Sequence, residues 1–162
     1  MKKLYYLGFI IVSFLVCCSF TPPKKITLEE VPLIGYFGDD EATEILEIEG
    51  SEFVFNYVED NKVSIDITVK AKKDFPKYTN GRVEYCYLMP YGADGEPIVT
   101  MTDDELIPEI TNSKVLLEMM DSFKAGETKV LNFKDLIFNE VSILDKIASF
   151  EIEIMVYGDT VE

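Results

Sequence analysis

Three cysteines are the most reactive side chains of this 162-residue chain, and the rest of the composition limits what they can do. A catalytic thiol needs a neighbouring base that lowers its pKa, and histidine is the usual one. The chain contains no histidine. The same absence removes Ser-His-Asp triads, Cys-His pairs and imidazole metal sites. Cys86 alternates with tyrosines, so we expect it to be a small buried hydrophobe and not a nucleophile.

Cys17 and Cys18 stand together at the end of an apolar segment. Two lysines precede Leu4 to Val16, thirteen residues of which eleven are apolar. This run is shorter than the roughly 18 to 20 apolar residues of a membrane-spanning helix, and Pro22 and Pro23 soon follow it. The pattern therefore predicts a cleaved signal peptide over residues 1–17.

The sequence Leu15-Val16-Cys17-Cys18 resembles the lipobox of bacterial lipoprotein signal peptides, in which an apolar residue stands three positions before an obligatory cysteine. The resemblance covers about the first 20 residues. It implies Cys18 as the lipidated residue, because the alternative acceptor, Cys17, would place bulky Val16 at the cleavage position. A thioether-linked diacylglycerol and an N-acyl chain such as palmitate would then anchor the protein to a membrane. An ordinary secretory signal and an uncleaved anchor remain as alternatives.

Location and partners follow from this segment and from the charge. Residues 18–25 would form a short tether that keeps residues 26–162, a single domain, close to the bilayer. We expect a protein of the bacterial cell envelope that faces the periplasm or the exterior, bound to the membrane through its N-terminal lipid. An envelope protein is the candidate partner. A formal charge of −15 argues against nucleic acid and favours partners with basic surfaces.

The acidic residues gather in short clusters: Asp39-Asp40-Glu41, Glu59-Asp60 and Asp103-Asp104-Glu105. None has the spacing of an EF-hand loop, and adjacent residues of a strand point to opposite faces. We interpret them as solvated charge and expect no metal, no cofactor and no catalytic residues. A hydrolase that uses carboxylates or a metal outside the cytoplasm remains an alternative, although 30 acidic residues single out no pair.

Tyr85, Tyr87 and Tyr91 recur along one expected strand. On an exposed face they could stack on a sugar or contact a peptide, so they are the candidate partner-contact residues. Alternatively, Tyr85 and Tyr87 share a face with Val83 and point into the core with their hydroxyls at its rim. We prefer this core interpretation.

The elements that would carry these side chains follow from the hydrophobic pattern. Strict alternation predicts strands at 63–70 and 150–157. Turn signals around further apolar and aromatic segments predict strands at 53–59, 82–91, 97–101 and 128–133, and a weaker signal predicts one at 26–34. Residues 43–49 fit a strand and a helix equally well. The strands at 82–91 and 97–101 would form a hairpin around Gly92 to Gly95.

One segment has helical spacing. After Asn112 and Ser113, the apolar residues share one helix face, and Gly126 lies just beyond the end; they are Val115, Leu116, Met119, Met120 and Phe123. This helix should cover a sheet edge or the end of a sandwich. A shorter helical turn is expected after Ser142.

These elements predict a mainly β fold, an antiparallel two-sheet sandwich with one or two short helices. It resembles the immunoglobulin-like sandwich, without the cysteines and tryptophan of antibody domains. About 145 mature residues can form a core without disulfides or metal. We expect a non-catalytic binding or assembly module. A structural subunit that exchanges strands between copies is a further alternative.

Overall fold

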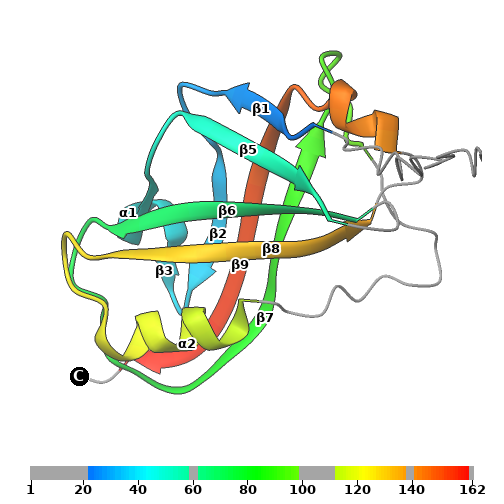
Figure 1. The fold of residues 1–162 in the computed structure, drawn as a ribbon. Helices are drawn as coiled ribbons and strands as arrows, with labels where there is room; N and C mark the ends of the chain where they lie inside the picture. The colour runs from blue at the N-terminus through cyan, green and yellow to red at the C-terminus, as the bar shows by residue number, and fades with distance from the viewer. Residues whose placement is uncertain (1–21, 59–61, 99–111, 138–140, 161–162) are drawn as a thin grey trace, which may run out of the picture.

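The computed structural model describes residues 22–58, 62–98, 112–137 and 141–160, which form two β-sheets packed face to face (Figure 1). The first sheet contains β1 (Lys24–Thr27), β4 (Leu46–Ile48), β5 (Glu52–Tyr57), β6 (Lys62–Ala71) and β8 (Thr128–Ile137). The second contains β2 (Leu33–Phe37), β3 (Asp40–Glu41), β7 (Tyr78–Tyr91) and β9 (Ser149–Thr160). Helices α1 (Ala42–Ile45) and α2 (Ser113–Ser122) and the 3-10 helix η1 (Val141–Lys146) complete the described chain. The predicted mainly β sandwich is confirmed.

Strand β6 is the centre of the first sheet. It pairs antiparallel with β8 along one edge, and with β5 and then β4 along the other. The N-terminal part of β5 leaves β6 and pairs with β1. Val63, Ile65, Ile67 and Val69 of β6 are buried, as their alternation with polar residues predicted.

The second sheet has the order β3-β2-β9-β7. The sequence predicted antiparallel sheets, whereas β2 runs parallel to β9; the other described strand pairs are antiparallel. Gly35 makes this pairing sterically feasible. It has φ +118°, and a Cβ placed on it would lie 1.7 Å from the carbonyl oxygen of Ile154. A side chain at this position would push β2 away from β9.

Three expected elements differ from those observed. The predicted strand 26–34 is divided into β1 and the beginning of β2, with a loop at residues 28–32 between them. Residues 43–49, for which a helix and a strand were equally expected, contain both: α1 ends at Ile45 and β4 begins at Leu46. The hairpin after β7 is present as a bridge from Tyr91 to Pro97, and residues 99–101 lie outside the described chain. Helix α2 and the turn η1 are confirmed close to their predicted positions.

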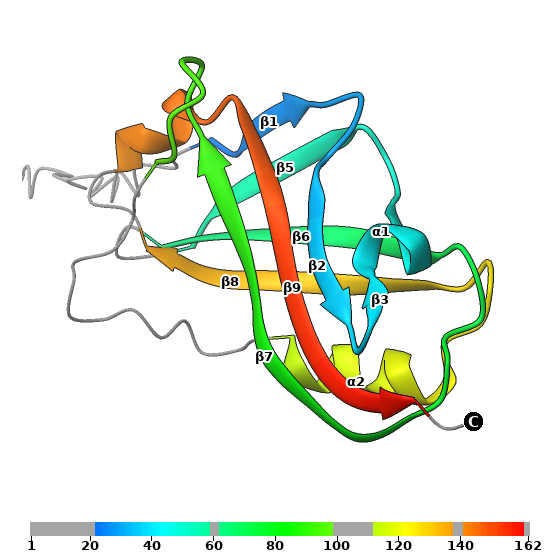
Figure 2. The same ribbon diagram turned by 180° about the vertical axis from the view of Figure 1, so that it is seen from behind.

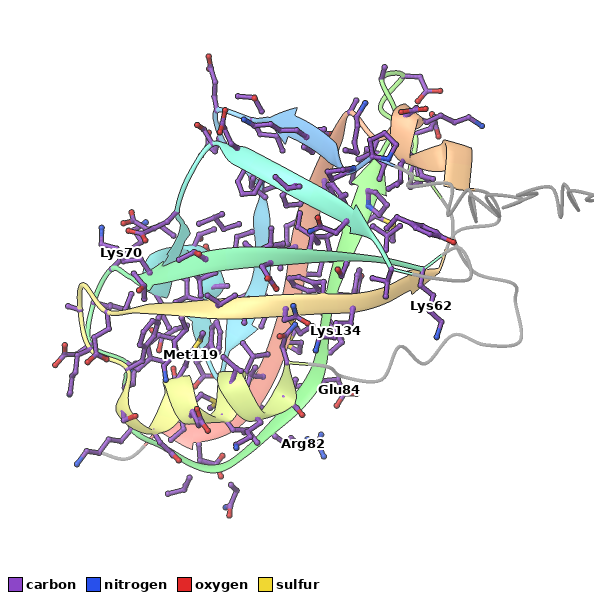
Figure 3. The ribbon with its side chains drawn as sticks, viewed as in Figure 1. Lys62, Lys70, Arg82, Glu84, Met119 and Lys134 are labelled. Atoms are coloured by element: carbon purple, nitrogen blue, oxygen red, sulfur yellow. The ribbon has the colours of Figure 1, made fainter. Side chains whose placement is uncertain are left out.

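Helix α2 packs against β7 at one open side of the sandwich, near β8 (Figures 1 and 2). Its buried N-cap residue Asn112 connects the two strands. The Asn112 Oδ1 accepts a hydrogen bond from the backbone N–H of Asn132 on β8 at 2.8 Å, and its Nδ2 lies 4.0 Å from the Sγ of Cys86 on β7. Met119 lies on the sheet side of α2 (Figure 3) and is completely buried. The helix therefore closes the sandwich at this side.

Aromatic side chains join the two sheets. Phe150 of β9 makes edge-to-face contacts with Phe53 and Phe55 of β5, with ring centroids 5.0 and 5.7 Å apart. At the other end of the sandwich, the ring of Phe75, in the loop after β6, packs against Phe37 of β2 and Phe123 at the end of α2. The ring centroids are 5.1 and 5.5 Å apart. Such pairs stabilise a core by more than their buried area alone.

In the ranges that the structure describes, no helix has the length and apolar character needed to cross a membrane.

Candidate functional site

The outer face of the second sheet carries an unusual set of side chains. On β9 the even-numbered residues from Phe150 to Val156 are buried, so the odd-numbered ones point outward. The residues paired with them on β7 and β2 point the same way. We call this surface the tyrosine face; it consists of Ile34, Tyr36, Arg82, Tyr85, Tyr87, Met89, Tyr91, Glu151, Glu153, Met155 and Tyr157.

The tyrosine face is open to solvent. Figure 2 shows β7, β9 and β2 nearest the viewer with the other sheet behind them. Ile34, Tyr36 and Tyr157 expose 47%, 44% and 44% of their surface, which is high for large apolar side chains. Tyr85 and Tyr87 are half-buried because their rings pack against each other, with centroids 5.5 Å apart.

The core interpretation of Tyr85 and Tyr87 is wrong. A register shift between Val83 and Tyr85 places Val83 opposite buried Val156 but Tyr85 opposite outward-facing Met155. A bulge of this kind moves every later side chain to the other face of the sheet. Cys86, between the two tyrosines, is therefore the residue that points inward.

Two tyrosine hydroxyls donate hydrogen bonds to carboxylates on the neighbouring strand. Tyr87 donates to Glu153, directly opposite, and Tyr91 donates to Glu151, diagonally opposite. Burial, reinforced by the hydrogen bond to Glu153, raises the pKa of Tyr87. The hydrogen bond to Glu151 is the main cause that raises the pKa of Tyr91 to about 12. Both tyrosines are therefore neutral donors at physiological pH.

A guanidinium already lies on this face. The Arg82 Cζ is 5.0 Å from the centroid of the Tyr157 ring, a cation–π distance, and its Nη2 is 4.0 Å from the Glu84 Oε2. Arg82 and Glu84 both extend outward from β7 (Figure 3). The end of the face near α2 thus combines a tyrosine ring, a cation and a carboxylate.

The other candidate residues are distributed as follows. Cys86 is buried, as predicted, and burial raises the pKa of its thiol to about 12, which does not suit a nucleophile. Cys17, Cys18 and two acidic clusters, Glu59-Asp60 and 103–105, lie outside the described residues.

The remaining acidic cluster has a structural partner. Asp40 accepts a hydrogen bond from the Tyr78 hydroxyl at 2.9 Å and lies 3.5 Å from the Lys73 Nζ. The backbone carbonyl oxygen of Phe37 lies 2.8 Å from the same hydroxyl, so the two acceptors share its single proton. Asp40 therefore helps to fix the turn after β2. Among residues 22–58, 62–98, 112–137 and 141–160, no three acidic or cysteine side chains come together as a metal site.

A hollow of about 440 Å³ lies between the loop before β2 and strand β4, lined by Glu29, Glu30, Glu47 and Lys72 among others. A general acid would need a raised pKa. The Glu47 carboxylate instead lies 2.9 Å from the Lys70 Nζ, and this hydrogen bond lowers its pKa. Glu47 is therefore suited to remain ionised and not to act as a general acid.

Of the tyrosine face, only Tyr85, Tyr87 and Tyr91 were predicted from the sequence as candidate contact residues. Glu151, Glu153 and Tyr157 could have been found, because they are the alternate residues of the predicted strand 150–157. No sequence pattern indicates that Tyr36 belongs to this face, because its position there depends on a parallel pairing between segments far apart in the sequence. No family model, curated protein or solved structure shows significant similarity to this chain.

Proposed function

We propose that this protein is a lipid-anchored, non-catalytic binding module of the bacterial cell envelope, and that it holds a protein partner on the tyrosine face. The observation that carries the proposal is the open face itself. Tyrosine, methionine and arginine are enriched in protein interfaces, and they gather here on the solvent side of the second sheet. Isolated exposed apolar residues need no explanation, whereas a continuous group of this kind marks an interaction site.

The position of the first strand fits a short anchor. Strand β1 begins at Lys24, six residues after Cys18, and six residues span at most about 20 Å. The Lys24 Nζ donates a hydrogen bond to the carbonyl of Asp145 in η1, at 3.2 Å. The tether would therefore leave the domain at the end where η1 lies.

The tyrosine face runs along the domain from this end. Tyr91 lies near η1, because its carbonyl accepts a hydrogen bond from the Ala148 N–H at 2.9 Å, and Tyr157 lies six residues further along β9 from Glu151. A domain tethered at η1 would present such a face sideways, to a neighbour in the same envelope layer, and not to the bilayer.

Metabolic labelling with a clickable fatty acid tests the anchor. We expect label on the wild-type protein and none on a variant with both Cys17→Ala and Cys18→Ala. A wild-type protein without label, or label that persists in the double variant, would overturn the anchored location.

Hydroxyl-radical footprinting tests the binding face. We expect the oxidation of Tyr36 and Tyr157 to be lower in intact cells than in the purified full chain. Val130, which exposes 50% of its surface on β8 of the other sheet, is the matched control and should react equally in both samples. Equal oxidation of the two tyrosines in both samples would refute a partner on this face.

A further inference from the structure

The chemistry of the tyrosine face indicates the kind of partner it takes. Arg82 of this face rests on the Tyr157 ring and also lies beside the Glu84 carboxylate, so a guanidinium of the chain itself already occupies one tyrosine ring of the face. The planar guanidinium suits such a position, because it stacks on aromatic rings and binds carboxylates through several N–H donors.

Two other tyrosines along β7 lie against carboxylates of β9 and donate hydrogen bonds to them directly. Glu153 lies with Tyr87, and Glu151 lies with Tyr91. Within the described part of the chain, neither glutamate takes part in an ion pair. Each tyrosine hydroxyl uses one carboxylate oxygen, which leaves acceptor capacity on the other oxygen.

The spacing of the two carboxylates indicates how the cations of a bound segment are arranged. Glu151 and Glu153 are two residues apart on one strand, so their Cα atoms lie about 6.6 Å apart on the same face. An extended segment with cationic side chains at positions i and i+2 has the same spacing. A segment with the cations at i and i+3 would direct them to opposite sides.

We infer that the tyrosine face binds an extended protein segment with arginine or lysine at alternate positions, whose cations meet Glu151 and Glu153 between the tyrosine rings. The inference rests on the proposed function, because it assigns the partner of that same face. A second copy of this chain is a poor occupant, since stacking two such faces would place carboxylates against carboxylates. An anionic bilayer is disfavoured for the same reason.

Tyrosine ring signals in the NMR spectrum of the full chain, held in neutral detergent micelles, provide the test. The probe is a blocked seven-residue threonine peptide with arginines at positions 3 and 5. Its control has the same composition with arginines at positions 3 and 6. We expect the first peptide to shift the Tyr87 and Tyr91 signals saturably, and to bind about fivefold more tightly than the second, as one additional ion pair implies.

Variants of Glu151 and Glu153 show whether their carboxylates bind the peptide. Glu151→Gln and Glu153→Gln keep an acceptor for the tyrosine hydroxyl but remove the charge, so each should weaken binding about fivefold. Glu52→Gln is the matched control, because it removes a charge from β5 in the other sheet, where Glu52 pairs with Lys25 at 2.7 Å. Binding should also weaken as salt is raised, which requires no variant.

Three results would overturn the inference: no saturable shift at about 2 mM peptide, a concentration that reveals even weak binding; equal affinity for both peptides; or an equal effect of Glu52→Gln. A fourth result, arginine amide that binds as well as the peptide, would rule out a segment in favour of a small cation. These results are independent of the fatty-acid labelling and of the footprint in cells. Cell data that support a partner, combined with a failed peptide titration, would therefore reject the cationic segment and leave the proposed function standing.

Discussion

Replacing Gly35 by alanine tests how the tyrosine face is built, because Gly35 lies between Ile34 and Tyr36 in the strand that pairs with β9. Its φ of +118° and a Cβ position 1.7 Å from the Ile154 carbonyl oxygen leave no room for a side chain. The positive φ should cost about 1–3 kcal/mol. Displacement of β2 would also weaken the flanking hydrogen bonds, from Ile152 N–H to the Pro32 carbonyl and from Gly38 N–H to the Val156 carbonyl, each worth about 1 kcal/mol.

We therefore expect Gly35→Ala to lower the free energy of unfolding by about 3–5 kcal/mol, measured by urea denaturation. Gly50→Ala is the matched control. Gly50 also has a positive φ, +94°, but nothing lies within 4 Å of its Cβ position, so it should show the backbone cost alone. If the two variants were equally stable, the close approach of β2 to β9 would be refuted.

Three further predictions concern single side chains. The NMR signal of the Tyr91 ring should titrate near pH 12. The hydrogen bond from Tyr91 should stabilise the fold fully below pH 10, and this stabilisation should be lost as the pH rises from 10 to about 12. A midpoint near pH 10 would contradict the hydrogen bond to its carboxylate partner. In a Cys17→Ala, Cys18→Ala variant, Cys86 should react with a thiol reagent only after denaturant is added, and rapid native reaction would show that it is exposed. Phe150→Ala should cost about 3–5 kcal/mol in urea denaturation, and a loss under about 1 kcal/mol would contradict its place between the sheets.

Local patterns predicted much of the fold. Strands β6 and β9 were predictable because one face of each is buried and the other is exposed to solvent, so polar and apolar residues alternate. Helix α2 was predictable because its buried side chains recur at helical spacing. Pairing between distant segments leaves no such local trace, and the parallel contact of β2 with β9 was accordingly missed.

The candidate site was predicted only in part, for two physical reasons. The bulge between Val83 and Tyr85 reverses the faces of the strand, and the pattern of apolar residues does not reveal a bulge when both faces carry large side chains. The carboxylate partners Glu151 and Glu153 lie 60 and 66 residues from their tyrosines, so their contacts depend on strand order. The assignment of Cys18 as the lipidated residue stays a prediction, because residues 1–21 are outside the described chain.

Site-specific photocrosslinking in living cells would show whether the tyrosine face holds a cationic protein segment. A photoreactive amino acid would replace Tyr36 on the tyrosine face or, as the control, Val130 on the opposite sheet. We expect a discrete crosslinked product at Tyr36 and none at Val130, with the attached partner segment carrying arginine or lysine at alternate positions. Crosslinking at Val130 alone, or equally at both positions, would contradict this expectation.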